Sequence, residues 1–172
     1  MRIKLINPNT TVAMTRSMAS AARDVAAAGS EIDAVTSESG PVSIEGHYDE
    51  AIAVLGLLDV MRSDPTADAY IIACFGDPGL LAAREITAAP VLGIAEAAMH
   101  AATFVATSFS IVTTLDRTRI IAEALVRNYG MQDACRKVRA TDLPVLDLEE
   151  ASERVNEVIL AECQRAVSDD RC

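Results

Sequence analysis

Short runs of strand-forming residues alternate along the chain with longer runs at helical spacing, and this order constrains the fold more than any other feature of the sequence. The strand-like runs are almost continuous in apolar residues, as residues 68–73 illustrate. Strands of a parallel sheet have this composition because helices cover both of their faces. The sequence therefore predicts an α/β fold with a parallel sheet and helices on both faces.

The elements can be placed approximately from the apolar spacing and from turn residues. Gly130, after the fifth helical run, suits a left-handed helix terminus. Thr10 is expected to cap the first helix. Strands are expected over residues 2–6, 31–36, 68–73, 91–93, 109–113 and 138–140, and helices over residues 10–28, 49–62, 78–88, 96–106, 116–129 and 149–167.

Composition excludes several classes of partner. A formal net charge of −10 argues against a nucleic-acid-binding protein, whose phosphate contacts need clustered Lys and Arg. Apolar runs end well before the ~18 residues of a membrane span, and the first strand leaves no room for a signal peptide. We expect a cytoplasmic protein with a small-molecule substrate, and a homo-oligomer.

The cysteines and histidines do not form a metal-binding pattern. Cys74, Cys135, Cys163 and Cys172 form no Cys-x-x-Cys pair, and the two histidines have no ligand spacing to them. Walker and Gly-x-Gly-x-x-Gly motifs are also absent, so nucleotide binding is unsupported. Any special cysteine is better sought as a reactive thiol in a reducing compartment.

Ligands of parallel α/β sheets bind beyond the carboxyl ends of the strands. The residues in that position are 7–10, 37–46, 74–77 and 113–114. The segment 37–46 is long for a β/α connection and is a candidate cover for a site. Glu45 and His47 at its end are expected to face solvent.

Cys74 is the strongest catalytic candidate. It follows a buried strand and precedes a helix for which Asp77 is the expected N-cap and Pro78 the first residue. The amides of that first turn favour negative charge, so the thiol is expected to ionise more readily than a free cysteine. Gly76 allows a ligand oxygen to approach the backbone. The alternative is that Cys74 is a small buried apolar residue.

The other candidates are open to a structural interpretation as well. Asn7 follows the first strand, where its amide either meets a ligand or only forms a turn. Thr113 and Thr114 either bind a substrate carbonyl or cap the helix that follows. Cys135 and Cys163 lie in polar surroundings expected to be helical, and His100 is expected to be a satisfied helix histidine.

Five ordered segments together resemble the hydantoin and allantoin racemases of the aspartate/glutamate racemase superfamily. The resemblance extends from residue 3 to at least residue 150. Its segments are INPNT (residues 6–10), GPVSIEG (40–46), ACFGDPG (73–79), GIAEA (93–97) and FSIVTT (109–114).

The resemblance implies two pseudo-symmetric α/β lobes, expected here as residues 1–93 and 94–172, with the active site between them. It implies two cysteines on opposite faces of the substrate and no metal, nucleotide or pyridoxal phosphate. Cys74 matches the first. The second belongs to a Leu-Gly-Cys-Ala-Gly type motif that this sequence does not contain, and Cys172 lacks its flanking glycines. The second lobe is therefore expected to lack its last strand or strands, leaving a sheet edge that favours self-association.

The implied reaction is racemisation of a 5-substituted hydantoin or allantoin by thiol proton transfer, with Cys74 as one acid/base. The amides of Phe75, Gly76 and Asp77 are candidate oxyanion donors. By analogy with matching family positions, Asn7, Ser43, Ile44, Thr113 and Thr114 hold the ring. The alternatives are a related one-thiol decarboxylase or cis–trans isomerase, and an inactive fragment or binding domain.

Overall fold

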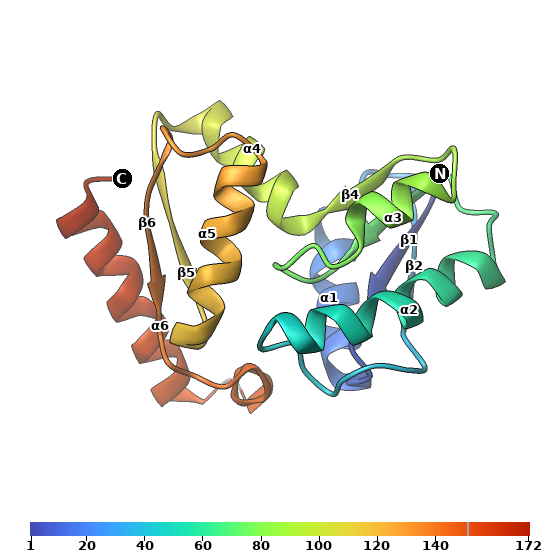
Figure 1. Ribbon diagram of the computed structural model, residues 1–172, viewed down its shortest axis with the longest axis horizontal. Coiled ribbons are helices and arrows are strands. Elements are labelled where there is room, and N and C mark those ends of the chain that lie inside the picture. Colours follow the sequence, from blue (N-terminus) through green and yellow to red (C-terminus); the bar gives the residue numbers. More distant parts are fainter. Residues whose placement is uncertain (151) are drawn as a thin grey trace. The chain divides into compact units, whose positions relative to one another are not determined.

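The computed structural model describes residues 1–150 and 152–172. The chain forms two compact units, Met1–Ile94 and Ala95–Cys172. Each unit has its own parallel sheet, and Figure 1 shows the first in blue to green and the second in yellow to red.

The sheet of the first unit has the strand order β2-β1-β3-β4, with every neighbouring pair parallel. β1 lies in the interior of the sheet, and Ile6 and Ile72 on β1 and β3 are fully buried. The parallel sheet and all four of its predicted strands are confirmed. The strands are β1 (Arg2–Asn7), β2 (Glu31–Thr36), β3 (Ala69–Ile72) and β4 (Val91–Gly93).

Helices connect these strands, as the α/β prediction requires. They are α1 (Val12–Val25), α2 (His47–Ser63) and α3 (Leu80–Glu85). The prediction that Thr10 caps the first helix is wrong, because the N-cap is Thr11 and its side chain makes no capping bond. The amide and hydroxyl of Thr10 instead donate to the carbonyl of Pro41, at 2.9 and 3.3 Å.

The second unit has a two-stranded parallel sheet of β5 and β6. Figure 1 shows α5 on one side of this sheet and α6 on the other. Apolar residues of α4, α5 and both strands form its core, among them Met99, Ile111, Leu125 and Val138. The elements are α4 (Ile94–Val105), β5 (Phe109–Thr113), η1 (Asp116–Thr118), α5 (Arg119–Asn128), β6 (Cys135–Ala140), η2 (Val145–Glu150), α6 (Glu153–Arg165) and η3 (Ala166–Asp170).

Two predictions for the second unit need correction. Cys135 begins β6, so the expectation of helical surroundings is wrong. The helix expected over residues 149–167 begins at Glu153, where the hydroxyl of Ser152 accepts a bond from the Val155 amide at 3.3 Å. Ala151, which that prediction included, lies outside the described residues. The left-handed Gly130 is confirmed, with φ of 71°.

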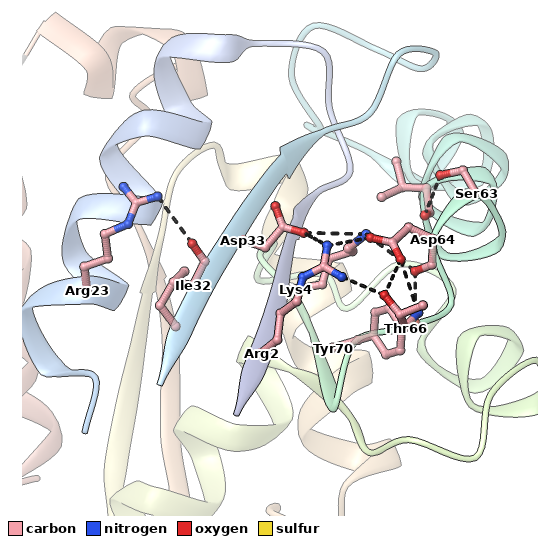
Figure 2. A network of polar contacts seen from close by, with 10 residues as sticks. Arg2, Lys4, Arg23, Ile32, Asp33, Ser63, Asp64, Thr66 and Tyr70 are labelled. Carbon is pink, nitrogen blue, oxygen red and sulfur yellow. Dashed lines mark hydrogen bonds and ion pairs between the residues drawn. The ribbon is translucent and has the colours of Figure 1, made fainter. Parts of the chain in front are cut away.

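A network of charged side chains holds the amino end of the first sheet, as Figure 2 shows. The buried Lys4 ammonium lies 2.6 Å from a carboxylate oxygen of Asp64, and the Arg2 guanidinium lies 2.6 Å from Asp33 and 2.5 Å from Asp64. These cations hold the pKa of the Asp64 carboxyl far below its usual range. The network joins β1, β2 and the turn before β3, at the end of the sheet opposite Cys74.

Candidate active site

Asn7, the last residue of β1, is fully buried. Its amide nitrogen donates to Asn9 Oδ1 at 2.8 Å and to Thr15 Oγ1 at 3.0 Å, and its amide oxygen accepts from the Asn9 backbone at 3.1 Å. The Ser37 hydroxyl donates to the Asn7 carbonyl at 2.9 Å. In this arrangement Asn7 holds the turn after β1, and a ligand contact would require some of these bonds to be exchanged.

The segment 37–46 lies against the turn after β1. The amide of Thr10 donates to the Pro41 carbonyl, and the hydroxyl of Thr11 donates to the Val42 carbonyl at 2.6 Å. Ser43 and Ile44 follow at once and are half-buried. Two of the segments expected at the site are therefore joined at the carboxyl end of the first sheet.

Cys74 lies two residues beyond the end of β3. It begins a turn that is closed by a hydrogen bond from the Asp77 amide to the Cys74 carbonyl at 3.0 Å. Asp77 has φ of 46° and Gly79 φ of 71°, so the backbone turns twice through the left-handed region before a helix forms. The prediction that Asp77 caps the helix and Pro78 begins it is wrong. The N-cap is Gly79, and α3 starts at Leu80.

The Asp77 side chain is buried and directed toward β4. Its carboxylate occupies the space that a β-carbon on Gly93 would need. Asp77 is thus fixed between its own turn and the neighbouring strand. Its carboxylate lies close enough to Cys74 to raise the pKa of that thiol.

The Cys74 side chain is half-buried. Burial raises the pKa of its thiol to about 12, and the nearby charges of Glu50 and Asp77 act in the same direction. A hydrogen bond from the Gly76 amide to the sulfur opposes them. The expectation of a readily ionised thiol is therefore wrong, because burial disfavours the thiolate and the two nearby carboxylates add to that effect. The helix whose first amides were expected to favour a thiolate starts only at Leu80.

Glu50 is the site residue that the sequence reasoning missed. It lies in the first turn of α2, and its carboxylate lies against the α-carbon of Gly76. His47, whose exposed side chain agrees with the sequence prediction, places Nδ1 3.0 Å from Glu50 Oε2. Burial raises the pKa of Glu50, and the bond from His47 opposes that rise. The signal in the sequence was the position of α2, which starts at the carboxyl end of β2.

In the second unit, Thr113 ends β5 and its hydroxyl lies 3.0 Å from the Thr118 hydroxyl. Neither Thr113 nor Thr114 caps a helix, because the residues in the N-cap positions are Leu115 for η1 and Thr118 for α5. The carbonyls of both threonines accept from the Thr141 amide at 3.0 Å. Both side chains are half-buried at the end of the strand.

The other candidate residues have structural surroundings. Cys163 and Cys172 are exposed, and Cys135 is half-buried. His100 places Nδ1 2.8 Å from the Glu96 carbonyl one helical turn earlier, as expected of a satisfied helix histidine. Over residues 1–150 and 152–172, no group of His, Cys, Asp and Glu is arranged to hold a metal ion, and no helix is long and apolar enough to span a membrane.

The first unit therefore presents a thiol with one amide donor to its sulfur and two carboxylates near it. At neutral pH the thiol carries its proton, which makes it an acid toward a carbanion or enolate. The carboxylates make this part of the surface unfavourable for a substrate that carries its own carboxylate here.

The model of the family Asp/Glu/Hydantoin racemase matches residues 3–172. The chain is 46% identical to a hydantoin racemase of Rhizobium meliloti and 44% identical to one of Pseudomonas sp. (strain NS671). Each alignment covers 99% of this chain, and 71% and 69% of the two relatives.

Solved structures agree. Allantoin racemase from Klebsiella pneumoniae superposes with a TM-score of 0.96 at 55% identity, over 99% of this chain and 70% of that one. Allantoin racemase from Pseudomonas fluorescens also gives 0.96, at 37% identity, over 100% of this chain and 74% of that one. Glutamate racemase from Campylobacter jejuni shares the fold, with a TM-score of 0.62 at 18% identity over 98% of this chain and 68% of that one.

Proposed function

Because the chain belongs to the Asp/Glu/hydantoin racemase family of isomerases, we propose that it takes part in inverting the carbon next to a carbonyl in a 5-substituted hydantoin or in allantoin. Cys74 is one of the two groups that transfer the proton, without a cofactor. The observation that carries the proposal is the half-buried Cys74 thiol at the carboxyl end of a parallel sheet, with the Gly76 amide bonded to its sulfur.

The chemistry requires a base on one face of the carbon and an acid on the other. Removal of the carbon-bound proton leaves an enolate, and a thiol on the opposite face protonates the carbon and inverts the centre. The high pKa of Cys74 supports a role as acid in the free protein. The 172 residues contain no Gly-Cys-Ala-Gly segment for the partner thiol, and the chain spans about 70% of the length of the relatives above.

The enolate oxygen needs donors that already point at it. The Gly76 amide is bonded to the Cys74 sulfur and the Asp77 amide to the Cys74 carbonyl, so the Phe75 amide is the donor we assign to the oxyanion. Ser43, Ile44, Thr113 and Thr114 are assigned to the ring, and Asn7 to holding the turn beside it.

The substrate class follows from charge. Glu50 and Asp77 lie near the thiol, and a substrate carboxylate at this place would be repelled. A hydantoin or allantoin ring brings amide groups there instead, and its ring carbonyls stabilise the enolate. We therefore assign this class in preference to aspartate or glutamate. A homo-oligomeric state and a cytoplasmic location stay predictions.

The proposal is tested by proton NMR of D- and L-5-substituted hydantoins in heavy water, with the Cys74→Ser variant as control. We expect exchange at the 5-position above the background rate, and its loss in Cys74→Ser. Exchange of one enantiomer without inversion would show a single working acid/base. Absence of exchange with a folded sample, for hydantoins and for allantoin alike, would overturn the proposal for this chain.

A further inference from the structure

We propose that Glu50, held by His47 against the Cys74 turn, is a positioning residue that keeps Cys74 protonated before substrate binds, so that Cys74 enters the reaction as the proton donor. The donor role rests on the proposed function. The effect of Glu50 on the thiol does not depend on it and can be measured without substrate.

Gly76 contacts both the Glu50 carboxylate and the Cys74 thiol. The Glu50 carboxylate fills the space that a side chain on Gly76 would need, and the amide of the same glycine donates to the Cys74 sulfur. One small residue thus lies between the carboxylate and the thiol. A larger residue at position 76 would push the carboxylate away, because the end of a glutamate side chain moves easily.

Burial raises the pKa of Glu50, whose side chain is 16% exposed, and two features favour its charged form against that effect. His47 Nδ1 lies 3.0 Å from the carboxylate on its solvent side. Glu50 also lies in the first turn of α2, where the helix dipole favours negative charge. Asp49, its neighbour on α2, acts in the opposite direction.

The charges around Cys74 have one sign. Glu50 faces it from α2 and Asp77 from its own turn, and each disfavours a thiolate. Asp77 is buried against Gly93, whereas Glu50 contacts the exposed His47 and is therefore the carboxylate open to exchange with solvent. A thiolate would place a third negative charge beside those of the two carboxylates. Burial of the sulfur and the two carboxylates together keep Cys74 as the thiol.

The step balances in protons and electrons. The S–H bond of Cys74 breaks with its electron pair left on sulfur, and the proton forms a new C–H bond with the enolate carbon. The base on the other face has already taken the original proton. The resulting thiolate lies beside Glu50, so recovery of a proton from solvent is favoured and restores the resting state.

The test is the rate of alkylation of Cys74 by iodoacetamide as a function of pH, resolved by mass spectrometry of the peptides, in the folded chain. Only the thiolate reacts. Glu50→Gln keeps the shape and removes the charge, and we expect the Cys74 rate at a given pH to rise about tenfold, equivalent to one pKa unit. Glu50→Asp keeps the charge and should restore most of the slow rate.

Controls are present in the same molecule. Asp59→Asn removes an equal charge from the exposed side of α2, 72% exposed, and should leave the Cys74 profile unchanged. The exposed Cys163 should react equally in all variants. Glu50→Ala is a second variant that lacks the Glu50 charge, and circular dichroism verifies that it folds.

A Cys74 profile for Glu50→Gln and Glu50→Ala that superimposes on the wild type would overturn the inference, as would an equal shift in Asp59→Asn. Absence of hydantoin exchange in the wild type, together with a Cys74 profile that shifts in the Glu50 variants, would instead count against the proposed function and leave the action of Glu50 on the thiol in place. The two failures are therefore distinguishable.

Discussion

The carboxylate of Asp77 occupies the space in which a side chain at Gly93 would lie. The two residues belong to different elements, the turn after β3 and the end of β4, and are brought together by the parallel pairing of Ile72 with Gly93. Asp77 also closes the turn that holds Cys74, through the bond from its amide to the Cys74 carbonyl. The absence of a side chain at Gly93 thus leaves room for the Asp77 carboxylate of the turn that holds Cys74.

Gly93→Ala should destabilise the protein by about 1–3 kcal/mol, the usual cost of adding an atom to a filled interior. The buried Asp77 side chain is short and cannot move aside easily. Urea unfolding measures the loss. In an Asp77→Ala background the same change should cost much less, since the atoms it collides with are gone. Equal costs in the two backgrounds would contradict the assignment.

Alkaline pH should destabilise the first unit through Cys74. The folded pKa of this thiol, about 12, lies above the unfolded value near 8.5, so the contribution is fully present below about pH 8.5 and is lost as the pH rises toward 12. The free energy of unfolding measured against pH should fall over this range. Cys74→Ser should flatten that decline, whereas Cys163→Ser, at an exposed site, should not.

Acidic pH should destabilise the second unit through Asp170. Arg139 and Ser110 bond to its carboxylate at 2.7 and 2.8 Å and lower the pKa of Asp170 to about 2. The unfolded value is near 3.9, so the contribution is present above about pH 4 and disappears as the pH falls to about 2.

Asp170→Asn should therefore be less stable than the wild type at neutral pH, and the difference should vanish below about pH 2. Urea midpoints across this range measure it. Asp169→Asn is the matched control, because that side chain is 61% exposed and lies 3.5 Å from Arg139. A difference that persists unchanged at low pH would exclude the charge as its cause.

Asn7→Ala should cost about 1–3 kcal/mol of stability, because it removes the acceptor of the buried Asn9 amide. Asn156→Ala, at an exposed position on α6, should change stability little. The measurement is urea unfolding of both variants. A stable Asn7→Ala chain with impaired hydantoin exchange would instead assign Asn7 to substrate binding.

The order of elements and the parallel sheet were predictable because apolar composition and helical spacing are local properties. Strands 31–36, 91–93 and 109–113 have the predicted bounds. The start of α3 was not predictable, because the left-handed conformations of Asp77 and Gly79 depend on contacts with Gly93 and with Val54 of α2. A proline normally favours a helix start, and here tertiary packing overrode that preference.

The thiol was predictable as a candidate and its protonation state was not. The sequence shows that Cys74 follows a buried strand. It also shows that a helix follows soon after, and from this we expected a thiolate. The ionisation of the thiol, however, depends on Glu50, which precedes it by 24 positions and reaches it only through folding. Neither the spacing of residues nor the composition shows that Glu50 and Cys74 lie near each other in the folded chain.

The sheet order places the first strand of the chain in the middle of its sheet, with β2 on one side and β3 on the other. At the amino end of β1 the Arg2 amide donates to the Asp68 carboxylate, and these two residues are 66 positions apart in the chain. During synthesis β1 can pair with β2 early, but its other edge stays open until β3 has left the ribosome. Long-range closure of this kind slows folding. The open edge of β1 is thus available for pairing with another chain from the emergence of β2 until β3 has left the ribosome.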